Sequence, residues 1–360
     1  MITFVLYKSA STQAQDYNIY HAKIIQAEKE IFQKGNIEKG LSIYSIVFQD
    51  FDFVFLRDCI IAMQIALYNS NEKLFIEFVA KSSKNGLLIR HLPLLKYIYN
   101  HAIYNKNKET VHQYLENNRK YYLQRLDTMT LKKIIRLFSI DQVEKSIIPN
   151  ETNKQREIRY KPLIRETAGK LIDLIKDKGF LGDMLIGIDQ NDIMHELSVG
   201  KYDAIDYYNK YKNSPNAYIV PLQFNLEEYL FASTLYFPIV VHFSNFWKDK
   251  SNKNRYVLHS DEFFQQQITN GRIHPQDLAY LYDLGLENSI TLNDDKTNER
   301  YFGIRSVFST TDHQDSLKDA KMNYFRGLYH ITPIQCQRAK INFMRKHGMH
   351  YSFGWNGCRS

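Results

Sequence analysis

Residues 35–80 read GNIEKGLSIYSIVFQDFDFVFLRDCIIAMQIALYNSNEKLFIEFVA. Apolar side chains recur in this stretch at positions i, i+4, i+7 and i+11, which is the spacing of one helix face. Two such stripes are Ile37, Leu41, Tyr44 and Phe48, and Leu56, Ile60, Met63 and Leu67. The stretch therefore predicts two consecutive amphipathic helices.

The same stretch carries an internal period of 34 residues. A turn residue followed five and nine positions on by packing residues occurs twice: Gly35, Gly40 and Tyr44, then Asn69, Leu74 and Phe78. Paired helices with this period resemble the tetratricopeptide repeat, although Gly40 and Leu74 stand where that family usually has alanine. No third copy is evident after residue 100. We expect a helical-repeat region over residues 1–125, and because two copies are few for a free-standing solenoid, we expect this region to pack on the C-terminal part of the chain.

The rest of the chain continues to show helical signals, so the expected fold class is mainly α. We expect helical-hairpin repeats packed on a larger helical domain over residues 126–348, with a tail over 349–360. The clearest strand signal is a turn-rich segment between two short apolar runs, which predicts a small β-hairpin near 289–308. The last helix is expected to have Thr332 as its N-cap and Pro333 as its first residue.

The charge of the chain is moderately basic. It has 47 Lys and Arg residues against 39 Asp and Glu residues, which gives a net charge of +8. A basic balance occurs in proteins that bind nucleic acid or membrane surfaces. Here the positive residues are scattered among acidic ones, so we interpret them as a solvated surface. Nucleic-acid binding is kept only as the weaker alternative.

The sequence gives no support for a metal or a cofactor, and none is expected. The chain has three cysteines, and no two of them stand at metal-ligand spacing. His195 and Glu196 begin like a zinc-protease motif, but Val199 stands where the second histidine ligand would be. No glycine-rich phosphate loop precedes a helix, so a nucleotide cofactor also lacks a motif.

The N-terminus bears on localisation. No stretch approaches the roughly 20 apolar residues of a membrane span, so no span is expected. Residues 2–7 are apolar, but this run is shorter than the core of a secretory signal peptide, and no basic segment precedes it. The sequence as it stands favours the cytoplasm. A periplasmic or exported location is the alternative if the N-terminus is a truncated signal peptide.

His242 stands out because it lies inside an otherwise apolar run, FPIVVHF at residues 237–243. A buried imidazole needs a hydrogen-bond partner. The residue is therefore either a hydrogen-bonded core histidine or a general base or ligand at the wall of a pocket. The sequence leaves both readings open.

Six short pieces between about residues 130 and 345 carry a family resemblance. They are Asp141-Gln142, residues 171–187, Val241-His242, residues 271–273 with 279–283, Tyr301-Phe302-Gly303 and Arg326-Gly327-Leu328. Together they resemble a bacterial family known as domain of unknown function 6624. The chain departs from the family at Lys145, Ser244 and Ile304-Arg305, which implies an altered polar site. The family brings no activity, and some of its members are exported.

The favoured function is protein interaction, in which the N-terminal repeats offer a groove to a peptide or protein partner. The alternative is a hydrolase-like enzyme whose acid–base residues come from the resemblance: Asp141, Gln142, His242, Asp283 and Arg305. His242 is expected to bind one of the other four, or Tyr301. Convergence of these side chains in one cleft would favour the enzyme, and dispersal would favour the binding module.

Overall fold

The computed structural model describes residues 15–144, 151–188, 261–287, 302–304 and 316–351. Every regular element within these ranges is helical, which confirms the mainly α prediction there. Only residues 302–304 of the predicted β-hairpin fall within them, and they form a turn, so the hairpin is not borne out at these positions. The physical reason is that the Asp283 carboxylate accepts the backbone N–H groups of residues 302 and 304, which a strand would give to its neighbour.

The first two helical hairpins have the same order of elements, a first arm, a short turn and a second arm. In the first, α1 (Tyr17–Glu28) continues through the π-helical turn η1 (Lys29–Gln33) and reverses into α2 (Ile37–Asp50). In the second, α3 (Leu56–Tyr68) reverses into α4 (Glu72–Ser83). The two turns share a left-handed residue, Gly35 with φ 72° and Ser70 with φ 52°. In the structure, the turn residue Gly35 is therefore equivalent to Ser70. The 34-residue period had aligned Gly35 with Asn69, one position earlier.

A third, irregular hairpin comes next. Its first arm is split into η2 (Ile89–Leu94), α5 (Lys96–Tyr99) and α6 (Ala102–Lys106), and its second arm is α7 (Lys108–Arg125). Asn107 precedes α7 as Asn71 precedes α4, and the backbone carbonyl of each accepts the first hydrogen bond of its helix at 3.0 Å. This hairpin begins before residue 100, and its broken first arm shows no apolar stripe, so no signal for it was evident in the sequence.

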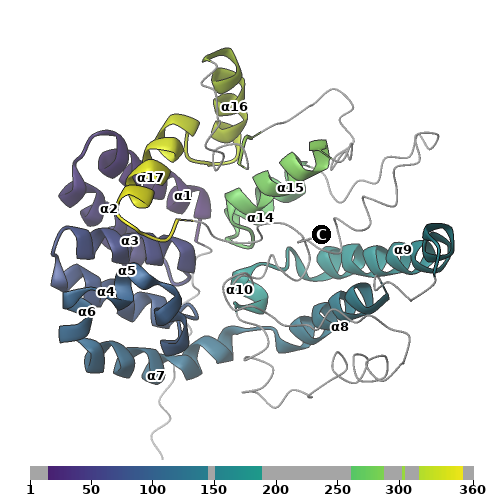
Figure 1. The fold of residues 1–360 in the computed structure, drawn as a ribbon, viewed down its shortest axis with the longest axis horizontal. Coiled ribbons are helices and arrows are strands. Elements are labelled where there is room, and N and C mark those ends of the chain that lie inside the picture. Colours follow the sequence, from purple (N-terminus) through teal and green to yellow (C-terminus); the bar gives the residue numbers. More distant parts are fainter. Residues whose placement is uncertain (1–14, 145–150, 189–260, 288–301, 305–315, 352–360) are drawn as a thin grey trace, which may run out of the picture.

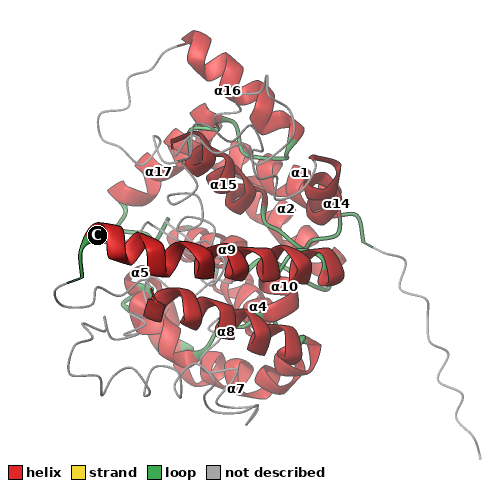
Figure 2. Ribbon diagram, turned by 90° about the vertical axis from the view of Figure 1, so that its right-hand side faces the viewer, coloured by secondary structure: helices red, strands yellow, loops and turns green. Residues whose placement is uncertain are grey.

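The remaining helices continue from the hairpins. A helix pair, α8 (Thr128–Glu144) and α9 (Asn153–Lys178), is followed by the short α10 (Asp183–Ile186). The later helices are α14 (Asp261–Thr269), α15 (Pro275–Glu287), α16 (Ser316–Leu328) and α17 (Ile334–Lys346). Figure 1 shows the hairpins stacked on one side and α8 with α9 on the other, while α17 lies against the hairpins. Figure 2 shows α8 and α9 running side by side.

Two apolar clusters hold these helices together. The main core runs from Tyr17 to Met349 and includes every helix of the first two hairpins. A small satellite cluster contains Met322 of α16 with Ile334 and Ile341 of α17. Among the described residues, no helix combines the length and apolarity that crossing a membrane requires.

Candidate functional site

The helix α3 is the centre of the candidate site. All its residues from 56 to 67 are buried, and three of them are polar: Arg57, Asp58 and Gln64. Buried polar groups require partners, because an unpaired one costs about 1–3 kcal/mol. Each of the three finds a partner far along the chain, in α15, the segment before it, or the segment after α17. The polar side chains of α3 therefore join the hairpins to the C-terminal helices.

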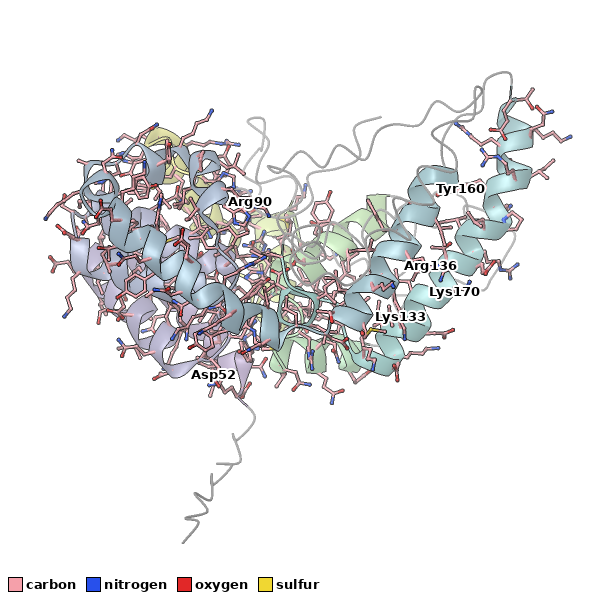
Figure 3. The ribbon with its side chains drawn as sticks, turned by 90° about the horizontal axis from the view of Figure 1, so that it is seen from below. Asp52, Arg90, Lys133, Arg136, Tyr160 and Lys170 are labelled. Carbon is pink, nitrogen blue, oxygen red and sulfur yellow. The ribbon has the colours of Figure 1, made fainter. Side chains whose placement is uncertain are left out.

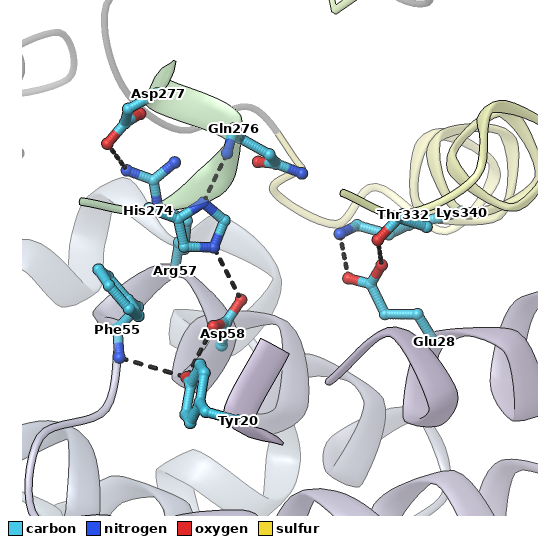
Figure 4. Close-up of polar contacts among 10 residues, drawn as sticks. All are labelled: Tyr20, Glu28, Phe55, Arg57, Asp58, His274, Gln276, Asp277, Thr332 and Lys340. Atoms are coloured by element: carbon cyan, nitrogen blue, oxygen red, sulfur yellow. Dashed lines mark hydrogen bonds and ion pairs between the residues drawn. The ribbon is translucent and has the colours of Figure 1, made fainter. Parts of the chain in front are cut away.

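Arg57 and Asp277 form a buried ion pair across this junction. The Arg57 Nη2 atom lies 2.8 Å from the Asp277 Oδ2 atom, and the two side chains are 2% and 10% exposed. Burial raises the pKa of the Asp277 carboxyl, and the adjacent guanidinium acts in the opposite direction. The pair fixes α15 against α3 (Figure 4).

Asp58 is the hub of a second group of contacts. The Tyr20 hydroxyl donates to its Oδ2 atom at 2.7 Å and accepts a hydrogen bond from the backbone N–H of Phe55 at 3.3 Å. The His274 Nδ1 atom accepts the backbone N–H of Gln276 at 3.2 Å, so its proton sits on Nε2. That Nε2 atom lies 3.8 Å from the Asp58 Oδ1 atom (Figure 4). The arrangement orients the imidazole toward the carboxylate.

The histidines at this junction are neutral near pH 7. Burial, reinforced by the nearby Arg57 charge, lowers the pKa of His274 well below its usual range. Burial and the neighbouring His274 do the same to the pKa of His21, whose ring centroid is 5.5 Å from that of His274. Burial also raises the pKa of Asp58. The junction thus excludes water from several titratable groups at once.

The helix α17 meets the hairpins through one buried ion pair and a set of rings. Lys340 pairs with the buried Glu28 carboxylate, whose other oxygen accepts the Thr332 hydroxyl at 2.7 Å. Thr332 was expected to cap the last helix; instead α17 begins at Ile334 and this hydroxyl is used by Glu28. Beside this pair, the Tyr68 ring packs edge-on against Phe343, with 5.0 Å between centroids.

Gln64 binds the backbone of the segment that comes after α17. Its Nε2 atom donates to the carbonyl of His350 at 2.9 Å, and its Oε1 atom accepts the backbone N–H of the same residue at 2.6 Å. Both hydrogen bonds go to main-chain atoms, so they do not depend on which side chain stands at position 350. A side-chain amide used in this way binds the main chain of a polypeptide and not a particular side chain.

Of the five residues predicted for an acid–base site, the structure describes the side chains of two, Asp141 and Asp283. Asp141 is buried between α8 and α9 and accepts the Tyr160 hydroxyl at 2.5 Å. Figure 3 labels Tyr160 on α9, with Lys133 and Arg136 on the neighbouring α8. Gln142 comes next on α8. The Gln142 side chain, His242 and Arg305 lie outside the described residues, as does the candidate partner Tyr301.

Asp283 holds a turn of the chain. Its two carboxylate oxygens accept the backbone N–H groups of Phe302 and Ile304 at 2.6 and 2.7 Å. The buried Arg326 completes this arrangement from α16, because its Nε atom donates to the Phe302 carbonyl at 2.8 Å. These residues, drawn from the family resemblance, therefore connect α15, the 302–304 turn and α16.

Known proteins give no outside guide to this site. No family model, no curated protein and no solved structure matches the chain. Among the residues that the structure describes, no three His, Cys, Asp or Glu side chains gather so that they could hold a metal ion.

The residues that form the junction were missed by the sequence analysis. The signal was present in residues 54–67, where Arg57, Asp58 and Gln64 interrupt a run that is otherwise apolar. Polar residues in such a run require buried partners. The sequence alone could not show that these partners stand more than 200 residues away.

Proposed function

We propose that the protein is an interaction module whose helical hairpins bind a polypeptide segment that is first helical and then extended. The binding face consists of the end of α1, η1 and α3, and the residues at its contacts are Glu28, Phe32, Gln64 and Tyr68. In the folded chain α17 and His350 lie on this face.

The observation that carries the proposal is the pair of hydrogen bonds from Gln64 to the backbone of His350. Main-chain recognition by a fixed side chain supplies affinity for an extended segment without specifying its sequence. Specificity then comes from the neighbouring contacts, which are one buried carboxylate and the Tyr68 ring. The same three kinds of contact suit a segment of another protein.

The hydrolase alternative gains no support from Asp141 and Asp283. The first accepts a tyrosine hydroxyl between two helices, and the second accepts two backbone N–H groups of its own chain. Carboxylates engaged in this way stabilise the native structure.

Site-specific photo-crosslinking in the cells that produce the protein tests the proposal. A photoreactive amino acid replaces Tyr68, which is 38% exposed at the edge of the face, or Ile158 of α9, which is 66% exposed, as the control. We expect a discrete protein adduct from position 68 that is absent from position 158 and is lost when Gln64→Ala is added. No adduct at position 68, or the same adducts from both positions, would contradict the proposal.

A further inference from the structure

We propose that α17 is a built-in competitor: it occupies a site that also takes a basic amphipathic helix of another protein. This inference rests on the proposed function and adds the class of partner and the way in which the site is regulated. Three features of α17 support it, namely its charge, the apolar contacts that hold it and the spacing of its contact residues.

The charge of α17 matches the face on which it lies. Residues 334–346 read IQCQRAKINFMRK, with four Lys or Arg residues and no acidic residue. One of these cations, Lys340, lies on the face and pairs there with Glu28, whose side chain is 2% exposed. A buried carboxylate without a cation is strongly unfavourable. The face therefore requires a ligand that brings a positive charge to this point and discriminates against one that does not.

The apolar contacts of α17 divide between α16 and the hairpins. Ile334 and Ile341 belong to the satellite cluster with Met322 of α16, apart from the main core. Of the buried α17 side chains, Met344 is the one that joins the main core. A methionine adapts easily to a different neighbour. Lys340, Phe343 and Met344 thus attach α17 to the hairpins through an ion pair, ring edges and one apolar side chain, all of which another helix can provide in its place.

The spacing of the contacts defines the partner. Counting from Lys340, an aromatic ring stands three positions on at Phe343, an adaptable apolar side chain at Met344, and a second ring seven positions on at His347. The rings of Phe343 and His347 both pack against Tyr68, with centroid distances of 5.0 and 4.7 Å. Positions three, four and seven lie on one helix face. The partner is a helix with a lysine, then aromatic and apolar residues at this spacing, followed by an extended segment.

The experiment measures binding of a fluorescent peptide of residues 330–351 to the full-length chain. In Lys340→Glu, the native helix places a carboxylate against Glu28, so it leaves the face and the added wild-type peptide can enter. The matched control is Lys346→Glu, which makes the same charge change at an exposed position of α17. We expect the peptide to bind Lys340→Glu at least about tenfold more tightly than it binds the wild-type chain or the control. A peptide that itself carries Lys340→Glu should not bind.

A second variant and a wild-type measurement guard against a folding defect. Phe343→Ala removes one ring from α17 and leaves the hairpin face unchanged, so it should also admit the peptide. In the wild-type chain, an excess of isotopically heavy peptide should speed amide hydrogen exchange in residues 334–346 of the protein. Equal binding to the wild type and all variants, or no binding together with unchanged exchange, overturns the proposal.

Two further outcomes are decisive. If Lys340→Glu or the wild-type chain instead forms dimers that exchange α17, as light scattering would show, the occupant is a second copy and the proposed partner class is wrong. A Gln64-dependent adduct at position 68 without peptide binding would leave the proposed function standing and refute only this inference. Peptide binding without any cellular adduct would show that α17 can be displaced, but it would refute the proposed function and with it this inference.

Discussion

Removal of the Asp277 carboxylate should destabilise the whole protein by about 3 kcal/mol. The perturbation is Asp277→Ala, which deletes the partner 2.8 Å from the Arg57 Nη2 atom. Breaking a buried pair by removing one member costs about 3–5 kcal/mol, because the other charge stays buried. We expect the lower end of this range, since the Asp183 charge also favours the charged form of Arg57. With a total stability of about 5–15 kcal/mol, such a loss is large.

The control removes both charges at once. In the double variant Arg57→Met with Asp277→Leu, no ion is left unpaired, and replacement of a buried pair by apolar residues of similar size is often neutral or stabilising. The double variant should therefore recover most of the stability that Asp277→Ala loses. The single variants Arg57→Met and Asp277→Leu form with this double variant a thermodynamic cycle that isolates the energy of the pair.

Urea denaturation followed by far-ultraviolet circular dichroism measures these effects. Because Arg57 is on α3 and Asp277 is on α15, a shift of one cooperative transition would mean that the hairpins and the C-terminal helices unfold together. The reasoning is refuted if Asp277→Ala loses less than about 1 kcal/mol, or if the double variant is as unstable as the single one.

Two other predictions concern protons and a glycine. Lowering the pH from 7.5 to 5.5 should reduce the free energy of unfolding by up to about 3 kcal/mol. In His274→Gln this pH-dependent loss should be about half as large. Denaturation at the two pH values measures both. The sign follows because His21 and His274 have lowered pKa values when folded, so below about pH 6.5 the unfolded chain binds protons that the folded protein does not. Gly271→Ala should cost about 1–3 kcal/mol in thermal or urea unfolding, because φ is +69° and the new Cβ would lie 2.8 Å from the Tyr17 ring.

Both predictions have internal controls. The raised pKa of Asp58 makes the folded protein bind a proton more readily as the pH falls, so this group offsets part of the histidine effect at the acidic end of the range. Stability that rises on acidification from pH 7.5 to 6 would refute the histidine argument. For the glycine, Gly169→Ala is the matched control, because a Cβ there meets nothing within 4 Å and alanine favours a helix. Equal effects of the two substitutions would contradict the strain at residue 271.

The helical fold was predictable because one physical signal dominates it. The stripes on α2 and α3 follow from the period of a helix, and burial of Leu41, Tyr44 and Ile60 confirms their inward face. The third hairpin was not predictable in the same way. Its first arm consists of helices of four to six residues, too short to show a stripe, and Pro93 interrupts one of them.

The candidate site was harder to predict because its energy comes from long-range pairs. A polar residue in an apolar run indicates that a partner exists, but sequence spacing carries no information about a partner such as His350, which is 286 positions from Gln64. The acid–base prediction relied on resemblance, and its described members illustrate the limit. Asp283 is polar and buried, yet its partners are backbone N–H groups, which every residue except proline has.

The polar residues of α3 contribute more to specificity for the segment that packs on α3 than to the strength of that packing. An entirely apolar α3 would accept any apolar helix at the right distance, whereas Arg57, Asp58 and Gln64 each penalise a neighbour that leaves them unpaired. Buried pairs add little net stability compared with apolar packing, so their contribution is to exclude wrong arrangements. The double variant at Arg57 and Asp277 separates the two effects. If its stability is restored while α15 loses its protection from amide exchange, the ion pair acts through specificity, and the same reasoning then applies to Glu28 and the helix that it selects.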